Sequence, residues 1–186
     1  MKPIHTTLVM LLLGSASALN LEGTLKTPVK GNARLGVFVV NPSGTPQYEW
    51  SSTALSGSTF SIQLLDDPPT RGLWSLSADT LTWPGVVGNV KISGTTATTE
   101  LKLFTYLDAD GNKKHSSNEK LLDTSLMSGK ANVVMVYVED GTTITGEKGL
   151  NVVLKPGWNL VTLAGGKTLT TQVLQNIKDA AVMVLE

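Results

Sequence analysis

Short apolar runs separated by glycine, proline, serine and threonine recur along this chain. Apolar and polar residues alternate over 21–25 and 60–64, and this period of two predicts strands with one buried face. Residues 35–40 and 133–138 are apolar at almost every position, as expected of strands that are covered on both faces. The pattern predicts an all-β fold, an antiparallel β-sandwich of the transthyretin or immunoglobulin type.

Glycine-containing pairs mark the turns between these runs. Asp140-Gly141 follows the run 133–138 and predicts a tight hairpin, because both residues tolerate positive φ. Pro156-Gly157 and Gly165-Gly166 predict turns on either side of the apolar run 158–163.

Two segments leave the choice between helix and strand open. A short helix is compatible with residues 120–128, which contain Leu121-Leu122 and Leu126-Met127, or with residues 172–178. The alternative at the end of the chain is a pair of strands over 169–174 and 181–185. We favour a strand at 181–185 because the run is short and rich in β-formers.

The first 18 residues have the three parts of a secretory signal peptide. Lys2 precedes the apolar run 8–13, and Ala16-Ser17-Ala18 forms a cleavage site of the A-x-A type. We expect a mature protein of residues 19–186, a single β-sandwich domain exported to the periplasm, the cell surface or the medium. The short signal favours a bacterial source. The chain has no cysteine, so this domain must fold without a disulfide and has no thiol nucleophile.

Charge is balanced, with 15 basic and 15 acidic residues, and cleavage removes only Lys2. No basic cluster exceeds Lys113-Lys114, so the phosphate-neutralising patch of a nucleic-acid-binding protein is absent from the sequence. After residue 18 no segment has the length and apolarity of a transmembrane span.

The side chains that usually carry catalysis are scarce. His115 is the only histidine of the mature chain and lies in a polar loop, where a general base is poorly desolvated. Asp66 and Asp67 point to opposite faces if they lie on a strand, so they do not form a glycosidase pair. The chain also lacks a glycine-rich phosphate loop. The sequence predicts a protein that is not an enzyme.

The four tryptophans divide into two pairs. Trp74 and Trp158 lie beside apolar residues, and we expect them in the core. Trp50 and Trp83 lie among polar residues or next to proline, and exposure of either would favour carbohydrate binding.

Residues 108–119 have the spacing of a twelve-residue calcium loop of the EF-hand type. Oxygen-bearing side chains fall at positions 1, 3, 5, 9 and 12, namely Asp108, Asp110, Asn112, Ser116 and Glu119. Lys114 at position 7 would add its backbone carbonyl. Glycine is expected at position 6, but Gly111 is at position 4 and Lys113 is at position 6. The alternative is a hairpin loop in which Asp and Asn side chains bind their own backbone.

The same segment, Tyr106–Glu119, resembles the loops of calcium-loaded, transthyretin-like (prealbumin-type) repeats of bacterial surface proteins. Tyr106, Asp108, Asp110 and Glu119 match the pattern of those loops, and its later Gly-x-x-Asp part is missing. The resemblance implies a sandwich of seven or eight strands that acts as a spacer or adhesion module, with calcium in a structural role.

Three functions remain after these exclusions. The first is a non-catalytic structural or protein-binding component of the cell envelope or surface, with other envelope or surface proteins as partners. The second is a module that binds a small ligand or a carbohydrate. The third is an exported hydrolase, which a buried carboxylate near His115 would favour.

Overall fold

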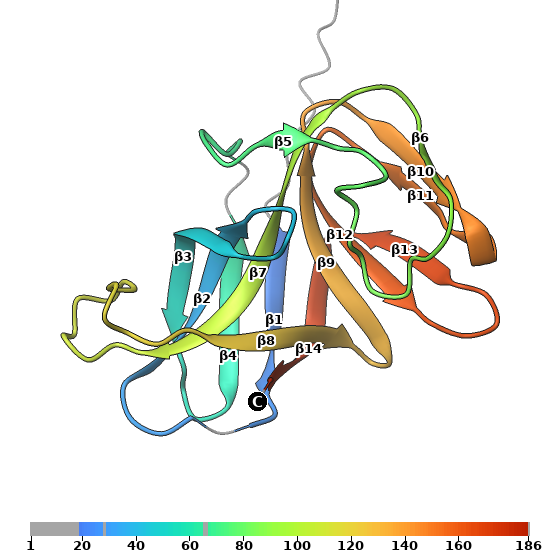
Figure 1. Cartoon of the computed structure of the whole chain (residues 1–186). Helices are drawn as coiled ribbons and strands as arrows, with labels where there is room; N and C mark the ends of the chain where they lie inside the picture. Colours follow the sequence, from blue (N-terminus) through green and yellow to red (C-terminus); the bar gives the residue numbers. More distant parts are fainter. Residues whose placement is uncertain (1–18, 28, 65–66, 186) are drawn as a thin grey trace, which may run out of the picture.

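The computed structural model describes residues 19–27, 29–64 and 67–185 (Figure 1), and the predicted signal peptide lies outside the described residues. The all-β prediction is confirmed. The only helical segment of the described residues is the 3-10 turn Glu147–Gly149, and no helix among them is long and apolar enough to cross a membrane. The strands are β1 Leu19–Leu25, β2 Ala33–Val40, β3 Pro46–Ala54, β4 Thr59–Leu64, β5 Trp74–Ser75, β6 Val90–Ile92, β7 Ala97–Leu107, β8 Leu122–Ser128, β9 Ala131–Val138, β10 Thr142–Gly146, β11 Asn151–Leu154, β12 Gly157–Ala164, β13 Thr170–Leu174 and β14 Asn176–Val184.

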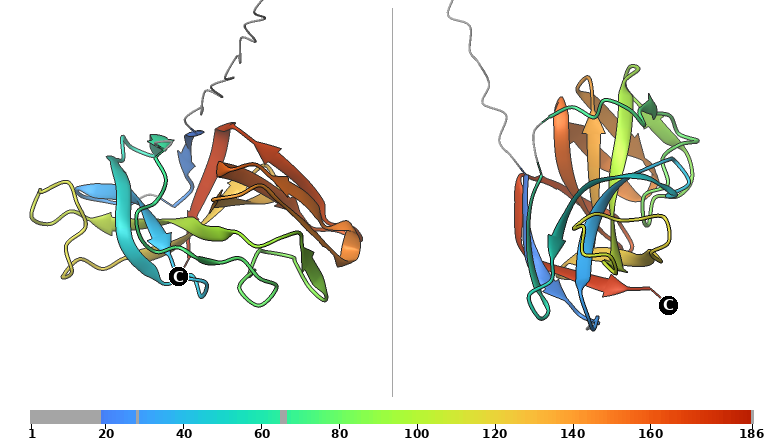
Figure 2. Two further views of the ribbon diagram at one scale, coloured as in Figure 1. Left: turned by 90° about the horizontal axis from the view of Figure 1, so that it is seen from above. Right: turned by 90° about the vertical axis from the view of Figure 1, so that its left-hand side faces the viewer.

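One large sheet folds around the main core. Its strands follow the order β13-β12-β9-β7-β8-β14-β1-β4, and β2 and β3 extend it from β7. Figure 2 shows the blue and cyan strands on one side of the molecule and the orange ones on the other. The inward side chains of β1, β4 and β14 meet those of β2, β7, β9 and β12 in one apolar cluster that includes Leu21, Leu35, Leu103, Met135 and Leu160.

A three-stranded sheet, β11-β10-β6, covers the other face of β9 and β12. Alternate residues of β9 therefore enter different clusters, with Met135 in the main core and Val134 and Val136 under the small sheet. This second layer explains the apolar run 133–138, and the prediction of a strand covered on both faces is confirmed.

Among the strands that the structure describes, the pairing is antiparallel except at one place. β14 lies between β8 and β1, and it runs antiparallel to β8 but parallel to β1. The predicted antiparallel arrangement does not extend to this pair. The two strands approach closely at Gly23, where a Cβ atom would collide with the backbone of Ala180, so glycine is needed at this position.

Both helical alternatives are wrong. Residues 122–128 form β8, and residues 172–178 belong to β13 and β14. A four-residue spacing such as that of Leu122 and Leu126 suits either a helix or one face of a strand. Pairing with β7, β9 and β14 decides for the strand. The favoured strand at the chain end is confirmed, and it begins earlier than expected.

The turn predictions have mixed outcomes. Gly165-Gly166 connects β12 and β13, which pair as predicted. Asp140-Gly141 does not close a hairpin, because β9 belongs to the large sheet while β10 pairs with β6 and β11. This dipeptide takes the chain from one sheet to the other.

The centre of the large sheet contains a fork. β7 and β9 pair only from Thr98 to Leu101, and beyond that point they diverge. β8 crosses the gap, pairing with β7 at Phe104 and Thr105 and with the start of β9 at its other end. Figure 1 shows the resulting triangle of β7, β8 and β9. The cavity described below lies in this triangle.

Candidate functional sites

The loop 108–121 folds over the outer face of β2 and β7. This face carries a small apolar cluster of Phe38, Val40, Phe104 and Tyr106. The ring of His115 packs edge-on against Phe38 and Tyr106, with centroid distances of 5.5 and 5.3 Å. The loop is therefore anchored by an aromatic contact in its middle.

Side chains of β3 hold the loop from the side. Glu49 accepts hydrogen bonds from the Tyr106 hydroxyl at 2.7 Å and from the backbone N–H of His115 at 2.9 Å. The Ser52 hydroxyl donates to the Lys113 carbonyl at 3.2 Å. These contacts fix the centre of the loop at a defined position above the sheet.

The loop brings three of the predicted ligands together. One carboxylate oxygen from each of Asp108, Asp110 and Glu119 lies within 4.8 Å of the other two. Asp108 and Glu119 are buried and Asp110 is exposed, so the cluster has one side open to solvent.

Glu119 closes the loop. Its two carboxylate oxygens accept hydrogen bonds from the backbone N–H groups of Ala109, at 2.7 Å, and Ser116, at 2.9 Å. Both ends of the twelve-residue segment are thereby joined through one side chain. Within the described residues Glu119 has no cationic partner, and these backbone N–H groups hold it in place.

Asn112 and Ser116 lie beside this cluster and bind to Asp110. The Asn112 amide and the Ser116 hydroxyl each donate to Asp110 Oδ2 at 2.8 Å. Hydrogen bonds from the Asn112 backbone and from Ser116 lower the pKa of Asp110, because they stabilise its charged form. Asn112 Oδ1 accepts from the Lys114 N–H at 2.7 Å. The two predicted ligands are thus near the carboxylates, but toward Asp110 they act as hydrogen-bond donors.

Asp108 carries the unusual feature of this loop. Its side chain is 3% exposed, and Oδ2 accepts a hydrogen bond from the Lys113 N–H at 3.1 Å. Oδ1 is buried and has no hydrogen-bond partner among the described residues. A buried polar atom without a partner destabilises the fold. A hard cation would satisfy this oxygen together with the neighbouring carboxylates.

The backbone resolves the apparent mismatch at position 6. Lys113 has φ of 65°, one of two non-glycine residues with positive φ among the described ones. This is the left-handed conformation that glycine supplies at position 6 of EF-hand-type loops. The loop therefore has the expected turn at the expected position, although lysine occupies it.

His115 does not have the contacts of a general base. Its Nε2 lies 2.9 Å from the Glu119 carbonyl oxygen. Glu119 is the buried carboxylate that the hydrolase alternative required near His115, but its oxygens accept backbone N–H groups instead. The geometry gives these two residues a role in shaping the loop.

Of the two tryptophans expected in the core, Trp158 is buried as predicted, whereas Trp74 is only half-buried and lies outside the core clusters. Trp83 is only 3% exposed, because its ring packs under the small sheet, so it does not provide the exposed aromatic surface that would favour carbohydrate binding. Trp50 is half-buried, with its ring centroid 5.7 Å from that of Trp158, and it lines a shallow groove with Tyr48, Arg71, Lys113 and Lys114.

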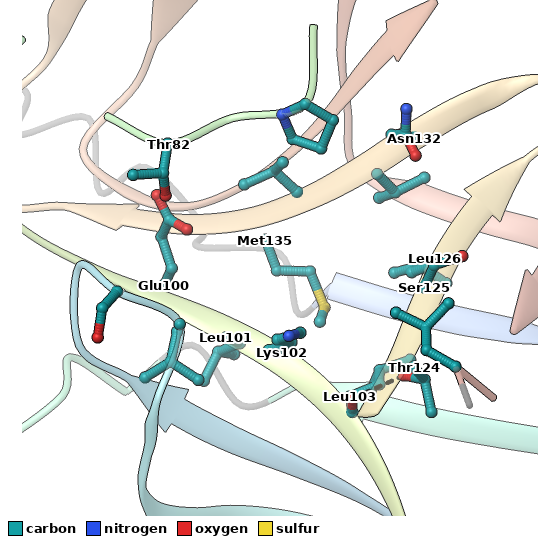
Figure 3. Close-up of a pocket in the computed structure, with 17 residues that line it drawn as sticks. Thr82, Glu100, Leu101, Lys102, Leu103, Thr124, Ser125, Leu126, Asn132 and Met135 are labelled. Atoms are coloured by element: carbon teal, nitrogen blue, oxygen red, sulfur yellow. Dashed lines mark hydrogen bonds between the residues drawn. The ribbon is translucent and has the colours of Figure 1, made fainter. Parts of the chain in front are cut away.

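The fork between β7 and β9 holds a cavity of about 350 Å³ that the sequence did not reveal. Figure 3 shows Glu100 and Thr82 at one end, Met135 in the middle, and Ser125 and Asn132 at the other end. Most of its wall is apolar, formed by Leu101, Leu103, Leu126, Val133 and Met135. The Thr124 hydroxyl donates to the Leu103 carbonyl at 2.6 Å and joins β8 to β7 at the edge of the cavity.

Glu100 is the titratable group of interest in this cavity. Burial raises its pKa to about 7, and the hydrogen bond from the Trp83 indole N–H, at 2.8 Å, opposes that rise. Lys102 also lines the cavity, but it forms an ion pair with Asp123 at 2.6 Å. The only signal of this site in the sequence was a glutamate just before the apolar residues Leu101, Leu103 and Phe104.

Comparison with known proteins adds no relative: no family model, no curated protein and no solved structure matches this chain.

Proposed function

We propose that this protein is a non-catalytic, exported β-sandwich that serves as a structural or protein-binding component of the cell envelope or surface, and that calcium stabilises its 108–119 loop. The observation that carries the calcium assignment is the buried, unpartnered Oδ1 of Asp108 beside two further carboxylates. The aromatic and Glu49 contacts support a structural role for the ion, because they connect the loop to β2, β3 and β7.

The chemistry of the cluster favours calcium over softer metals. All the side chains that converge are oxygen donors, and calcium takes six to eight oxygens in a flexible geometry. Magnesium requires a stricter octahedron at shorter distances, so a loop with five candidate side chains around an open edge suits it less well.

Thermal unfolding of the purified mature chain tests this proposal. Calcium at ten times its Kd stabilises the folded state by about 1.4 kcal/mol. For a domain of this size that corresponds to a rise of about 3–6 °C in the melting temperature. Magnesium should raise it less. Asp108→Asn should abolish the rise, whereas Asp79→Asn, which changes an exposed aspartate outside the loop, should preserve it.

A melting temperature that does not respond to calcium up to about 10 mM, beyond the range of weak extracellular sites, would contradict the metal assignment. The loop would then be a connection held by its own hydrogen bonds.

The export part of the proposal has its own test. Amino-terminal sequencing of protein from the native host should begin at Leu19 or within two residues of it. Leu19 and Leu21 are 1% and 0% exposed in β1, so cleavage well beyond them would remove core residues. Recovery of the mature protein with Met1 intact would contradict export by signal cleavage.

A second candidate function, the binding of a small ligand, is favoured by the fork cavity. Its volume lies at the lower end of the range for small-molecule sites, and its wall is mainly apolar with a few polar groups. The chemical class of that ligand is argued next.

A further inference from the structure

The polar groups in the fork cavity have unused hydrogen-bonding capacity. Glu100 Oε1 accepts from Trp83, but Oε2 has no hydrogen bond with a described residue. The side chains of Ser125 and Asn132 are half-buried, and within the described part of the chain neither has a hydrogen-bond partner. Partly buried polar groups that converge on a cavity without protein partners are typical of a binding site.

The charge in the cavity is negative at one end. Glu100 and Lys102 are its charged lining residues, and the Lys102 ammonium is neutralised by Asp123. The residues of β9 beside Glu100 are apolar, including its cross-strand partner Val136. A cationic group at Glu100 would therefore face no competing positive charge.

The arrangement of these groups defines an order along the cavity. Glu100 lies at one end, the apolar side chains around Met135 form the middle, and Ser125 and Asn132 lie at the other end (Figure 3). We propose that the fork cavity binds a small primary amine with an apolar body, whose ammonium group contacts Glu100 and whose far end carries a hydroxyl or carbonyl that contacts Ser125 and Asn132. This inference specifies the second candidate function above and is independent of calcium.

Three probes of equal length test the proposal, namely 6-aminohexan-1-ol, hexane-1,6-diol and 6-hydroxyhexanoate. Each has a hydroxyl at one end, and they differ only in the other end, which is an ammonium, a hydroxyl or a carboxylate. The mature chain is titrated at pH 8 without added calcium, so that the test does not depend on the metal proposal. The NMR signal of the Trp83 indole N–H, assigned with a Trp83→Phe variant, reports binding because this group contacts Glu100.

We expect saturable binding of the amine, at least tenfold tighter than that of the diol, with the carboxylate weakest. Glu100→Gln keeps an acceptor for Trp83 and should reduce the preference for the amine to less than threefold. Ser125→Leu should weaken the amine and the diol together, because it fills the opposite end. The preference of the wild type should fall at pH 5, where the carboxyl of Glu100 is protonated and the amine remains charged.

The outcomes distinguish the preference for an amine from ligand binding in the cavity as such. Equal affinities for the amine and the diol, or a preference that survives Glu100→Gln, would overturn the assignment to amines while leaving ligand binding in place. The absence of saturable binding by all three probes would overturn both. Neither result bears on the calcium response of the loop.

Discussion

Glu100 and Asp108 stand near the two ends of β7, and each has one carboxylate oxygen with a protein donor and one without. Their surroundings differ. Glu100 faces an apolar fork, where burial raises its pKa to about 7. Asp108 faces two other carboxylates in a polar loop. An unpaired oxygen alone therefore does not identify a ligand, since an apolar site favours a proton or one cationic group, whereas a cluster of oxygens favours a metal.

The strongest test of this contrast introduces a second carboxylate beside Glu100. Val136 is 0% exposed and pairs with Glu100 across β7 and β9. Val136→Asp should prevent folding, because an unpaired buried charge costs several kcal/mol, comparable with a total stability of about 5–15 kcal/mol. Circular dichroism should show loss of the strand signal. Val153→Asp, at a position 60% exposed in β11, is the matched control and should fold. If Val136→Asp folds, the region near Glu100 accommodates a second carboxylate, as the 108–119 loop does, and the contrast between the two sites is wrong.

Removing the charge of Glu100 should have a smaller effect with a defined pH dependence. Its folded-state pKa of about 7 exceeds the ordinary value of 4.5, so the folded protein holds the proton more tightly. The contribution of Glu100 to stability therefore decreases as pH rises from about 4.5 to about 7 and stays low above that range. Glu100→Gln should be more stable than the wild type by about 2 kcal/mol at pH 8, roughly 4–8 °C, and by little at pH 4. Chemical unfolding at both pH values measures this. A constant difference would contradict a raised pKa.

The turn at Lys113 predicts a stabilising substitution in the loop. A side chain other than glycine at positive φ costs on the order of 1 kcal/mol. Lys113→Gly should raise stability by about 0.5–1 kcal/mol, and it should also tighten calcium binding because it removes a positive charge. Lys114→Gly is the control, since its φ is not positive and it should bring no backbone gain. Equal effects of the two variants on stability would indicate that backbone strain at position 113 is unimportant.

The smallest expected effect is the coupling between the two carboxylates. Eight residues of extended strand separate them by roughly 25 Å, so they share no partner. The stability changes of Glu100→Gln and Asp108→Asn should add in the double variant to within about 0.5 kcal/mol at any calcium concentration. A larger coupling energy would show that the fork and the loop respond to each other through β7.

The resemblance of Tyr106–Glu119 to transthyretin-like repeats stays a prediction, because no relative was found that tests it. The loop geometry agrees with the spacing on which it rests, in that Asp108, Asp110 and Glu119 converge. The cluster of described residues contains no further carboxylate in place of the aspartate of the missing Gly-x-x-Asp part. The calcium proposal is therefore based on the geometry of this loop and not on the resemblance.

The sequence by itself determined the strand content, the double covering of 133–138 and the convergence of the three acidic residues of the loop, because all three depend on local periodicity or on spacing within twelve residues. Tertiary structure alone decided the parallel pairing of β14 with β1, the transfer of the chain between sheets at Asp140-Gly141 and the burial of Trp83. It also decided the fork cavity. Glu100, Ser125 and Asn132 come from three strands, and they meet only because β7 and β9 stop pairing after Leu101 and β8 crosses the gap. Strand pairing is a long-range property, and neither the period of a strand nor the chemistry of a turn specifies which partner it finds.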